Sequence, residues 1–155
     1  MPLLRRFPEP SDPKREKPAP GDLRVLVTRR DGKPVAVVYR PKVAGFQGRP
    51  TVFTSPTGQE SIDQIEFWND VKLEYEKTET GFNVVVSLPL AKLGLALVPG
   101  TIQKMDVGYI FGNETGNTTA TRAYWSNKSF TAGVTQDVPH EVRLEPAQWG
   151  SATVE

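Results

Sequence analysis

Residues 104–127 decide the fold and read KMDVGYIFGNETGNTTATRAYWSN. In the first third, apolar and polar or small residues alternate with a period of two, as in a strand with one buried face. Residues 112–118 follow, rich in Gly, Asn and Thr, which tolerate tight turns. The stretch predicts a β-hairpin whose second strand ends in the aromatic pair Tyr124 and Trp125.

The same alternation recurs on both sides of this hairpin. Strands are expected at 23–28 and 35–40 around an Asp-Gly turn, and at 71–76 and 82–88 around a Glu-Thr-Gly turn. Residues 51–54 and 62–68 are shorter candidates, and residues 138–144 are expected to close the sheet. Pro89 interrupts the pattern, and Leu90, Leu93 and Gly94 predict one helical turn over 89–94. Seven to nine short strands predict an all-β fold, an antiparallel β-sandwich of jelly-roll or immunoglobulin type.

The composition narrows the class of protein. The chain has 155 residues, as expected for one domain, and 19 basic against 18 acidic residues leave a net charge of +1. This balance argues against a nucleic-acid partner and against an anionic membrane surface. Cysteine is absent and His140 is the sole histidine, which excludes disulfides, thiolate metal sites and multi-histidine zinc sites. No acidic pair and no Gly-x-Ser-x-Gly motif points to an active site, so we do not expect an enzyme.

The ends of the chain differ from its middle. Residues 1–20 contain six of the 14 prolines together with charges of both signs, which predicts an extended linker or tail. Residues 21–150 are expected to form the domain and 151–155 a C-terminal tail. Trp149 is expected to fold back over the core.

A candidate ligand site surrounds the aromatic pair. An indole ring beside amide, hydroxyl and guanidinium groups suits a sugar, which has an apolar face and a rim of hydroxyls. Consecutive strand residues face opposite sides, so one of the two rings is expected in the core and the other near the surface. The alternative is a hairpin whose aromatic residues only pack, with Arg122 paired to Asp106 or Glu114. The candidate ligand-binding residues are Trp125, Tyr124, Arg122, Asn127, Asn113 and, as a second aromatic, Trp68.

The turn also offers oxygen atoms to a cation. Asp106 and Glu114, with the amides and hydroxyls of 113–117, are hard ligands of the kind that calcium prefers, although their spacing is not that of an EF-hand. The alternative is a turn whose Asn and Thr side chains bond to their own backbone. A structural calcium ion is therefore a weak expectation.

Several segments resemble a known family. GFNVVVSLPL at 81–90, Leu93-Gly94, DVG at 106–108, Gly116 and RAYWSN at 122–127 are similar to the carbohydrate-binding module family 9-like group, within the DOMON-like β-sandwiches. Residues 137–141 and 146–150 also resemble C-terminal modules of large exported bacterial proteins. The resemblance implies a non-catalytic sandwich that holds sugar between aromatic rings, often near calcium. It also implies an extracellular or periplasmic location, with the export signal outside this chain.

Two functional hypotheses follow. The first is a monomeric module that binds a glycan through Trp125 or Tyr124. The second is a structural or interaction module that packs against other domains of a larger exported protein, with the same aromatic residues buried.

Overall fold

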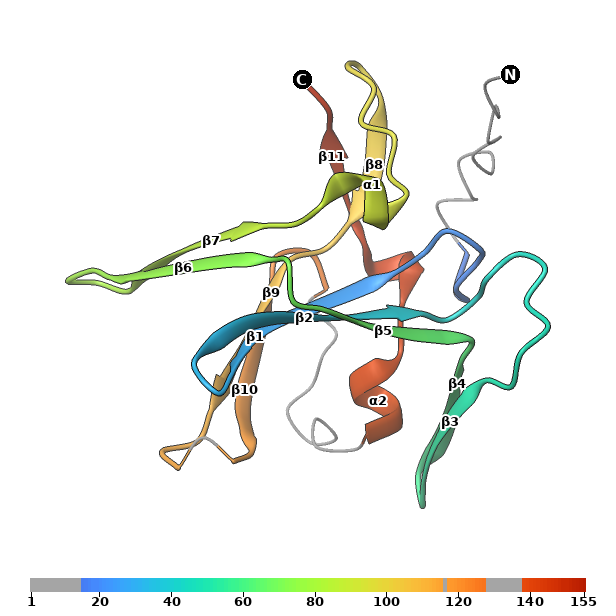
Figure 1. Ribbon diagram of the computed structural model, residues 1–155, viewed down its shortest axis with the longest axis horizontal. Helices are drawn as coiled ribbons and strands as arrows, with labels where there is room; N and C mark the ends of the chain where they lie inside the picture. The colour runs from blue at the N-terminus through green and yellow to red at the C-terminus, as the bar shows by residue number, and fades with distance from the viewer. Residues whose placement is uncertain (1–14, 116, 128–137) are drawn as a thin grey trace.

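The computed structural model describes residues 15–115, 117–127 and 138–155, and this part of the chain is mostly antiparallel β-structure (Figure 1). None of its helices has the length and hydropathy that a membrane span requires. The elements in order are β1 (Arg24–Arg30), β2 (Lys33–Arg40), β3 (Thr51–Ser55), β4 (Gly58–Ile62), β5 (Gln64–Trp68), β6 (Lys72–Lys77), β7 (Phe82–Ser87), α1 (Leu90–Leu93), β8 (Ile102–Met105), β9 (Gly108–Gly112), β10 (Thr119–Tyr124), α2 (Val138–Val142), the 3-10 helix η1 (Pro146–Gln148) and β11 (Gly150–Thr153).

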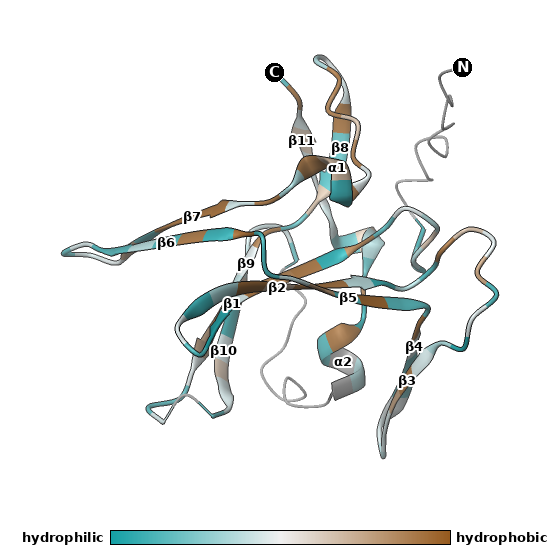
Figure 2. Ribbon diagram, in the orientation of Figure 1, coloured by the Kyte–Doolittle hydropathy of each residue, from teal (hydrophilic) through white to brown (hydrophobic). Residues whose placement is uncertain are grey.

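The core lies on a three-stranded sheet with the order β1-β2-β5. Ala36 of β2 pairs with Trp68 of β5, and both side chains are buried together with Val38 on the same face. Leu88 and Leu93, before and within α1, pack onto this face. The predicted hairpin of β1 and β2 is confirmed, because alternating apolar residues give this sheet a buried side. Figure 2 shows hydrophobic residues concentrated along the middle of β2.

Residues 138–142 form helix α2, which contacts β3 and β4, whereas a strand had been expected over 138–144. Arg24 of β1 donates to the carbonyl oxygen of Glu141, and the amide of Arg143 donates to the carbonyl oxygen of Pro139 at 3.1 Å. The expected strand is wrong because proline has no N–H for a sheet ladder, whereas the first turn of a helix needs none at that position. Pro139 is fully buried, and Val142 and Leu144 join the core.

The remaining strands form two-stranded ribbons that extend from the central sheet in different directions (Figure 1). The ribbon β6-β7 and the helical turn α1 were both predicted, and Gly94 ends α1 in the left-handed conformation with φ 70°. The ribbon β3-β4 was only half predicted, because β4 begins directly after the Pro56-Thr57 turn. The described sheets are small and are not closed against one another.

The stretch 104–127 departs from the prediction at Asp106. Instead of one strand over 105–111, β8 ends at Met105 and β9 begins at Gly108. β8 pairs with β11, while β9 pairs with β10 as the expected hairpin. β11 begins at Gly150, so residues expected as a tail belong to a sheet.

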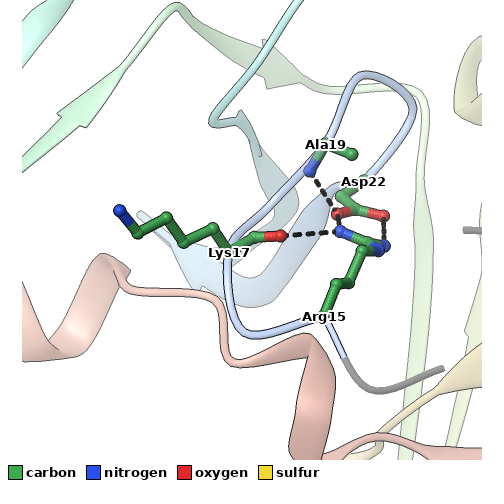
Figure 3. Close-up of polar contacts among 4 residues, drawn as sticks. All are labelled: Arg15, Lys17, Ala19 and Asp22. Carbon is green, nitrogen blue, oxygen red and sulfur yellow. Dashed lines mark hydrogen bonds and ion pairs between the residues drawn. The ribbon is translucent and has the colours of Figure 1, made fainter. Parts of the chain in front are cut away.

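The N-terminal segment is fixed from Arg15 onward by a compact set of polar contacts (Figure 3). The Arg15 guanidinium forms a two-point ion pair with Asp22 and also donates to the carbonyl oxygen of Lys17 at 2.9 Å. It lies 5.8 Å from the ring of Trp149, which is half-buried. Residues 15–20 of the expected linker are therefore attached to the folded part, while residues 1–14 lie outside the described residues.

Candidate functional site

The indole of Trp125 lies at the surface beyond the end of β10, with 53% of the residue exposed. Its amide donates to the carbonyl oxygen of Val107 at 2.8 Å, which fixes the backbone. The ring rests on Gly150 of β11: a Cβ there would lie 2.6 Å from Cζ3 of the indole. A glycine at 150 thus permits this ring position, and the Cζ3 and Cη2 atoms of the indole lie against it.

Tyr124 is half-buried and lies over Gly108, its partner in the β9-β10 ladder. A Cβ at 108 would lie 2.5 Å from Cδ1 of the tyrosine, so the ring occupies the space that a side chain would fill. Covering a strand glycine with a cross-strand aromatic ring stabilises the pairing. Tyr124 therefore has a packing role within its own hairpin.

Arg122 points away from solvent. Its side chain is 2% exposed and forms an ion pair with Glu141 of α2. Neither Asp106 nor Glu114, the partners considered from the sequence, makes this pair. Arg122 joins β10 to α2, which leaves its guanidinium out of reach of a ligand beside Trp125.

Asp106 and Asn127 organise the backbone between β8 and the end of β10. The Asp106 carboxylate accepts hydrogen bonds from the amides of Val107 at 2.9 Å, Ser126 at 2.8 Å and Asn127 at 3.1 Å. The side-chain amide of Asn127 donates to Glu145 at 2.8 Å. These contacts explain the break in the predicted strand, because a carboxylate that gathers three amides holds a turn.

Asn113 lies at the other end of the hairpin from Trp125 and closes the turn of β9-β10. Its side-chain oxygen accepts a hydrogen bond from the backbone amide of Asn117 at 3.1 Å. Its backbone amide donates to the carbonyl oxygen of Thr118 at 2.9 Å. Glu114 is exposed in the same turn. Within the described ranges, no group of three or more acidic, His or Cys residues is arranged to hold a metal ion. The side-chain oxygens of Asn113, Thr115 and Asn117 bond within the turn itself.

Trp68 is in the core rather than beside Trp125, with only 4% of the residue exposed. Its indole N–H donates to Glu66 at 3.0 Å, and Nε of Arg40 donates to the other carboxylate oxygen at 2.9 Å. Burial raises the pKa of the Glu66 carboxyl, but the hydrogen bonds from Arg40 and Trp68 together lower that pKa below its ordinary value. The predicted pair of sugar-clamping rings is not formed by Trp68 and Trp125.

The structure instead brings together four aromatic residues that the sequence interpretation left out, which we call the aromatic cluster: Tyr75, Phe82, Tyr109 and Phe111. Phe82 is central, with its ring centroid 5.6 Å from that of Tyr75, 5.2 Å from that of Tyr109 and 5.9 Å from that of Phe111. These contacts join the ribbon β6-β7 to the hairpin β9-β10. Each of the four belongs to a period-two pattern along its strand, which favours burial of one face, yet three of them are exposed.

Two shallow hollows, of about 330 and 350 Å³, lie away from Trp125 and from the aromatic cluster. Residues around Asp22 and Arg40 line the first, and residues around Arg30 and Phe67 line the second. Neither hollow contains a residue of the predicted site or of the aromatic cluster.

Comparison with protein-family models, with curated proteins and with solved structures gives no match for this chain. The site must therefore be interpreted from its own geometry.

Proposed function

We propose that this chain is a non-catalytic interaction module whose aromatic cluster docks onto another protein or onto another domain of a parent protein. The observation in support is the exposure of three of its four members, 59% for Tyr75, 42% for Tyr109 and 38% for Phe111. Together they present the equivalent of about 1.4 aromatic side chains, or roughly 300 Å². The largest apolar patch of an ordinary monomer has about this size and is often functional.

The open arrangement of the sheets supports the same proposal. A β-ribbon with one apolar face is stable when a second layer covers that face. In this proposal, the partner supplies the second layer of the β-sandwich that the sequence predicts. The polar residues expected to bind a ligand beside Trp125 support this choice, since Arg122 and Asn127 are bonded to Glu141 and Glu145.

Site-specific photo-crosslinking tests the proposal. p-Benzoylphenylalanine replaces Tyr75 or Tyr109, and Val52 on β3 is the control because it is similarly exposed, at 48%. In cells of the source organism, we expect a discrete covalent adduct from positions 75 and 109 and none from 52. Equal adducts from all three positions, or none from any, would contradict an interaction surface at the cluster.

A second candidate function is glycan binding at Trp125, as the resemblance to carbohydrate-binding modules implies. The supporting observation is the 53% exposure of this residue, because an exposed indole can stack on a sugar. Titration with oligosaccharides, with and without calcium, tests it through tryptophan fluorescence. A saturable change that is lost in Trp125→Ala supports a glycan site, and no change with any sugar eliminates it.

A further inference from the structure

The outer edge of β6 is an unpaired strand edge within the described part of the chain. β6 pairs with β7 alone. The amide of Thr78 bonds to the carbonyl oxygen of Gly81 at 2.9 Å, and hydrogen-bonded positions alternate along an antiparallel ladder from that point. Glu74 and Glu76 therefore bond to β7, while the backbone groups of Tyr75 and Lys77 point outward.

An independent contact confirms this orientation. Nη2 of Arg29 donates to the carbonyl oxygen of Leu73 at 3.2 Å, as an outward-pointing carbonyl at that position permits. Arg29 also limits the open edge, because its guanidinium already occupies the outward-pointing carbonyl oxygen of Leu73. The open edge consists of residues 74–77, enough for one short added strand.

The two faces beside this edge differ sharply in chemistry. Tyr75, 59% exposed, lies on the same face as Leu73 and the exposed Lys77, and stacks on Phe82 of the aromatic cluster. Glu74 and Glu76 lie on the opposite face and are both exposed. A strand added here would place alternate side chains against an aromatic surface and against two carboxylates.

We propose that the edge of β6 accepts an extended peptide segment of the partner, in which aromatic or aliphatic residues alternate with Lys or Arg. This inference rests on the proposed function and names the chemistry of the partner. The backbone pairing supplies affinity, and the two faces set the residue pattern.

A second copy of this chain does not fit the same edge. Antiparallel pairing of β6 with β6 would place Glu74 and Glu76 of one copy beside the same residues of the other, on one face. Like charges opposite one another destabilise a strand pair.

The test uses the synthetic peptide Lys-Leu-Lys-Phe-Lys-Leu-Lys and the full chain. Two comparison peptides are Glu-Leu-Glu-Phe-Glu-Leu-Glu and a non-alternating peptide of the first composition. Binding is measured by fluorescence anisotropy, and strand addition by hydrogen exchange of individual amides. We expect the alternating lysine peptide to bind best and to slow exchange at Tyr75 and Lys77, whose amides point outward, more than at Glu74 and Glu76.

Charge reversal provides the matched comparison. Glu74→Lys/Glu76→Lys should weaken binding of the lysine peptide about tenfold and favour the glutamate peptide, because two cross-strand attractions become repulsions. Glu16→Lys/Glu155→Lys changes the net charge equally at two exposed positions outside the β6-β7 ribbon, and should leave the preference unchanged. Tyr75→Ala should weaken both peptides.

Three results would overturn the inference: no binding at millimolar peptide, equal weakening in both charge-reversed variants, or slowed exchange elsewhere without protection at Tyr75. If crosslinks from positions 75 and 109 persist in that case, the partner docks in another geometry and the proposed function stands. If the crosslinks are also absent, the proposed function fails with it.

Discussion

The carboxylate of Glu66 offers the sharpest test of how the core is held together. It accepts one hydrogen bond from Nε of Arg40 at 2.9 Å and one from the indole of Trp68 at 3.0 Å. The side chains of Arg40 and Glu66 are 18% and 30% exposed, so water competes only in part. Glu66→Gln keeps the shape but replaces one acceptor oxygen by an NH₂ group, which then faces a donor.

The expected cost follows from these contacts. A hydrogen bond to a charged group contributes about 1.5–3 kcal/mol, and a buried donor left without an acceptor adds its desolvation penalty. Because Glu66 is partly exposed, we expect Glu66→Gln to lower the free energy of unfolding by about 2 kcal/mol at pH 7. In a Trp68→Phe background the glutamine can turn its oxygen toward Arg40, and the same change should cost about 1 kcal/mol.

The pH dependence of stability tests the role of the Glu66 carboxylate independently. The pKa of Glu66 is lowered from 4.5 in the folded state, so its ionised form contributes stability that is fully present above the unfolded pKa. That contribution is lost as the pH falls through the folded value. Urea unfolding followed by tryptophan fluorescence should show a difference between wild type and Glu66→Gln at pH 7 that shrinks in strong acid. Equal stability at pH 7, or a difference independent of pH, would refute this account of the core.

Three further predictions concern the hairpin region. Asp106→Ala should lower the free energy of unfolding by about 2 kcal/mol, because three amides lose a charged acceptor. The stability of Asp106→Asn should lie between those of wild type and Asp106→Ala, and an unchanged urea midpoint would contradict the role of Asp106. Gly108→Ala should cost about 1–3 kcal/mol, because its Cβ would lie 2.5 Å from Tyr124 and 2.9 Å from the carbonyl oxygen of Ala123. Gly58→Ala, whose nearest atom is 3.8 Å away, should change thermal stability little, and equal effects of the two would refute the packing argument. Asn113→Ala should speed amide exchange at Asn117 and Thr118 while leaving the global unfolding midpoint within about 0.5 kcal/mol, and a large global loss would show that this turn supports the core.

The sequence was sufficient for elements whose signal is local. The hairpins β1-β2 and β6-β7, and the Gly94 end of α1, follow from alternation and turn residues. The sequence also predicted one ring of the pair in the core and the other near the surface: Trp125 is exposed, but Tyr124 is only half-buried, against Gly108, and is not part of the core. Polar residues in the 113–117 turn were correctly considered as partners of their own backbone.

Long-range contacts decided the rest, because they depend on which elements meet. Residues 138–142 form a helix that contacts β3 and β4 and buries Pro139 and Val142, and a period-two pattern does not reveal such long-range packing. The pairing of Arg122 with Glu141 joins residues from separate elements that no spacing rule connects.

What the sequence determined by itself was the type of local structure, an antiparallel β-rich chain with turns at Gly, Asn and Pro. Only the tertiary structure decided which apolar faces are covered. Trp68 was a candidate ligand ring and is buried in the core, while Tyr75, Tyr109 and Phe111 belong to a pattern that favours burial and are exposed. Alternation identifies which residues share a face, but burial depends on whether another layer packs against that face.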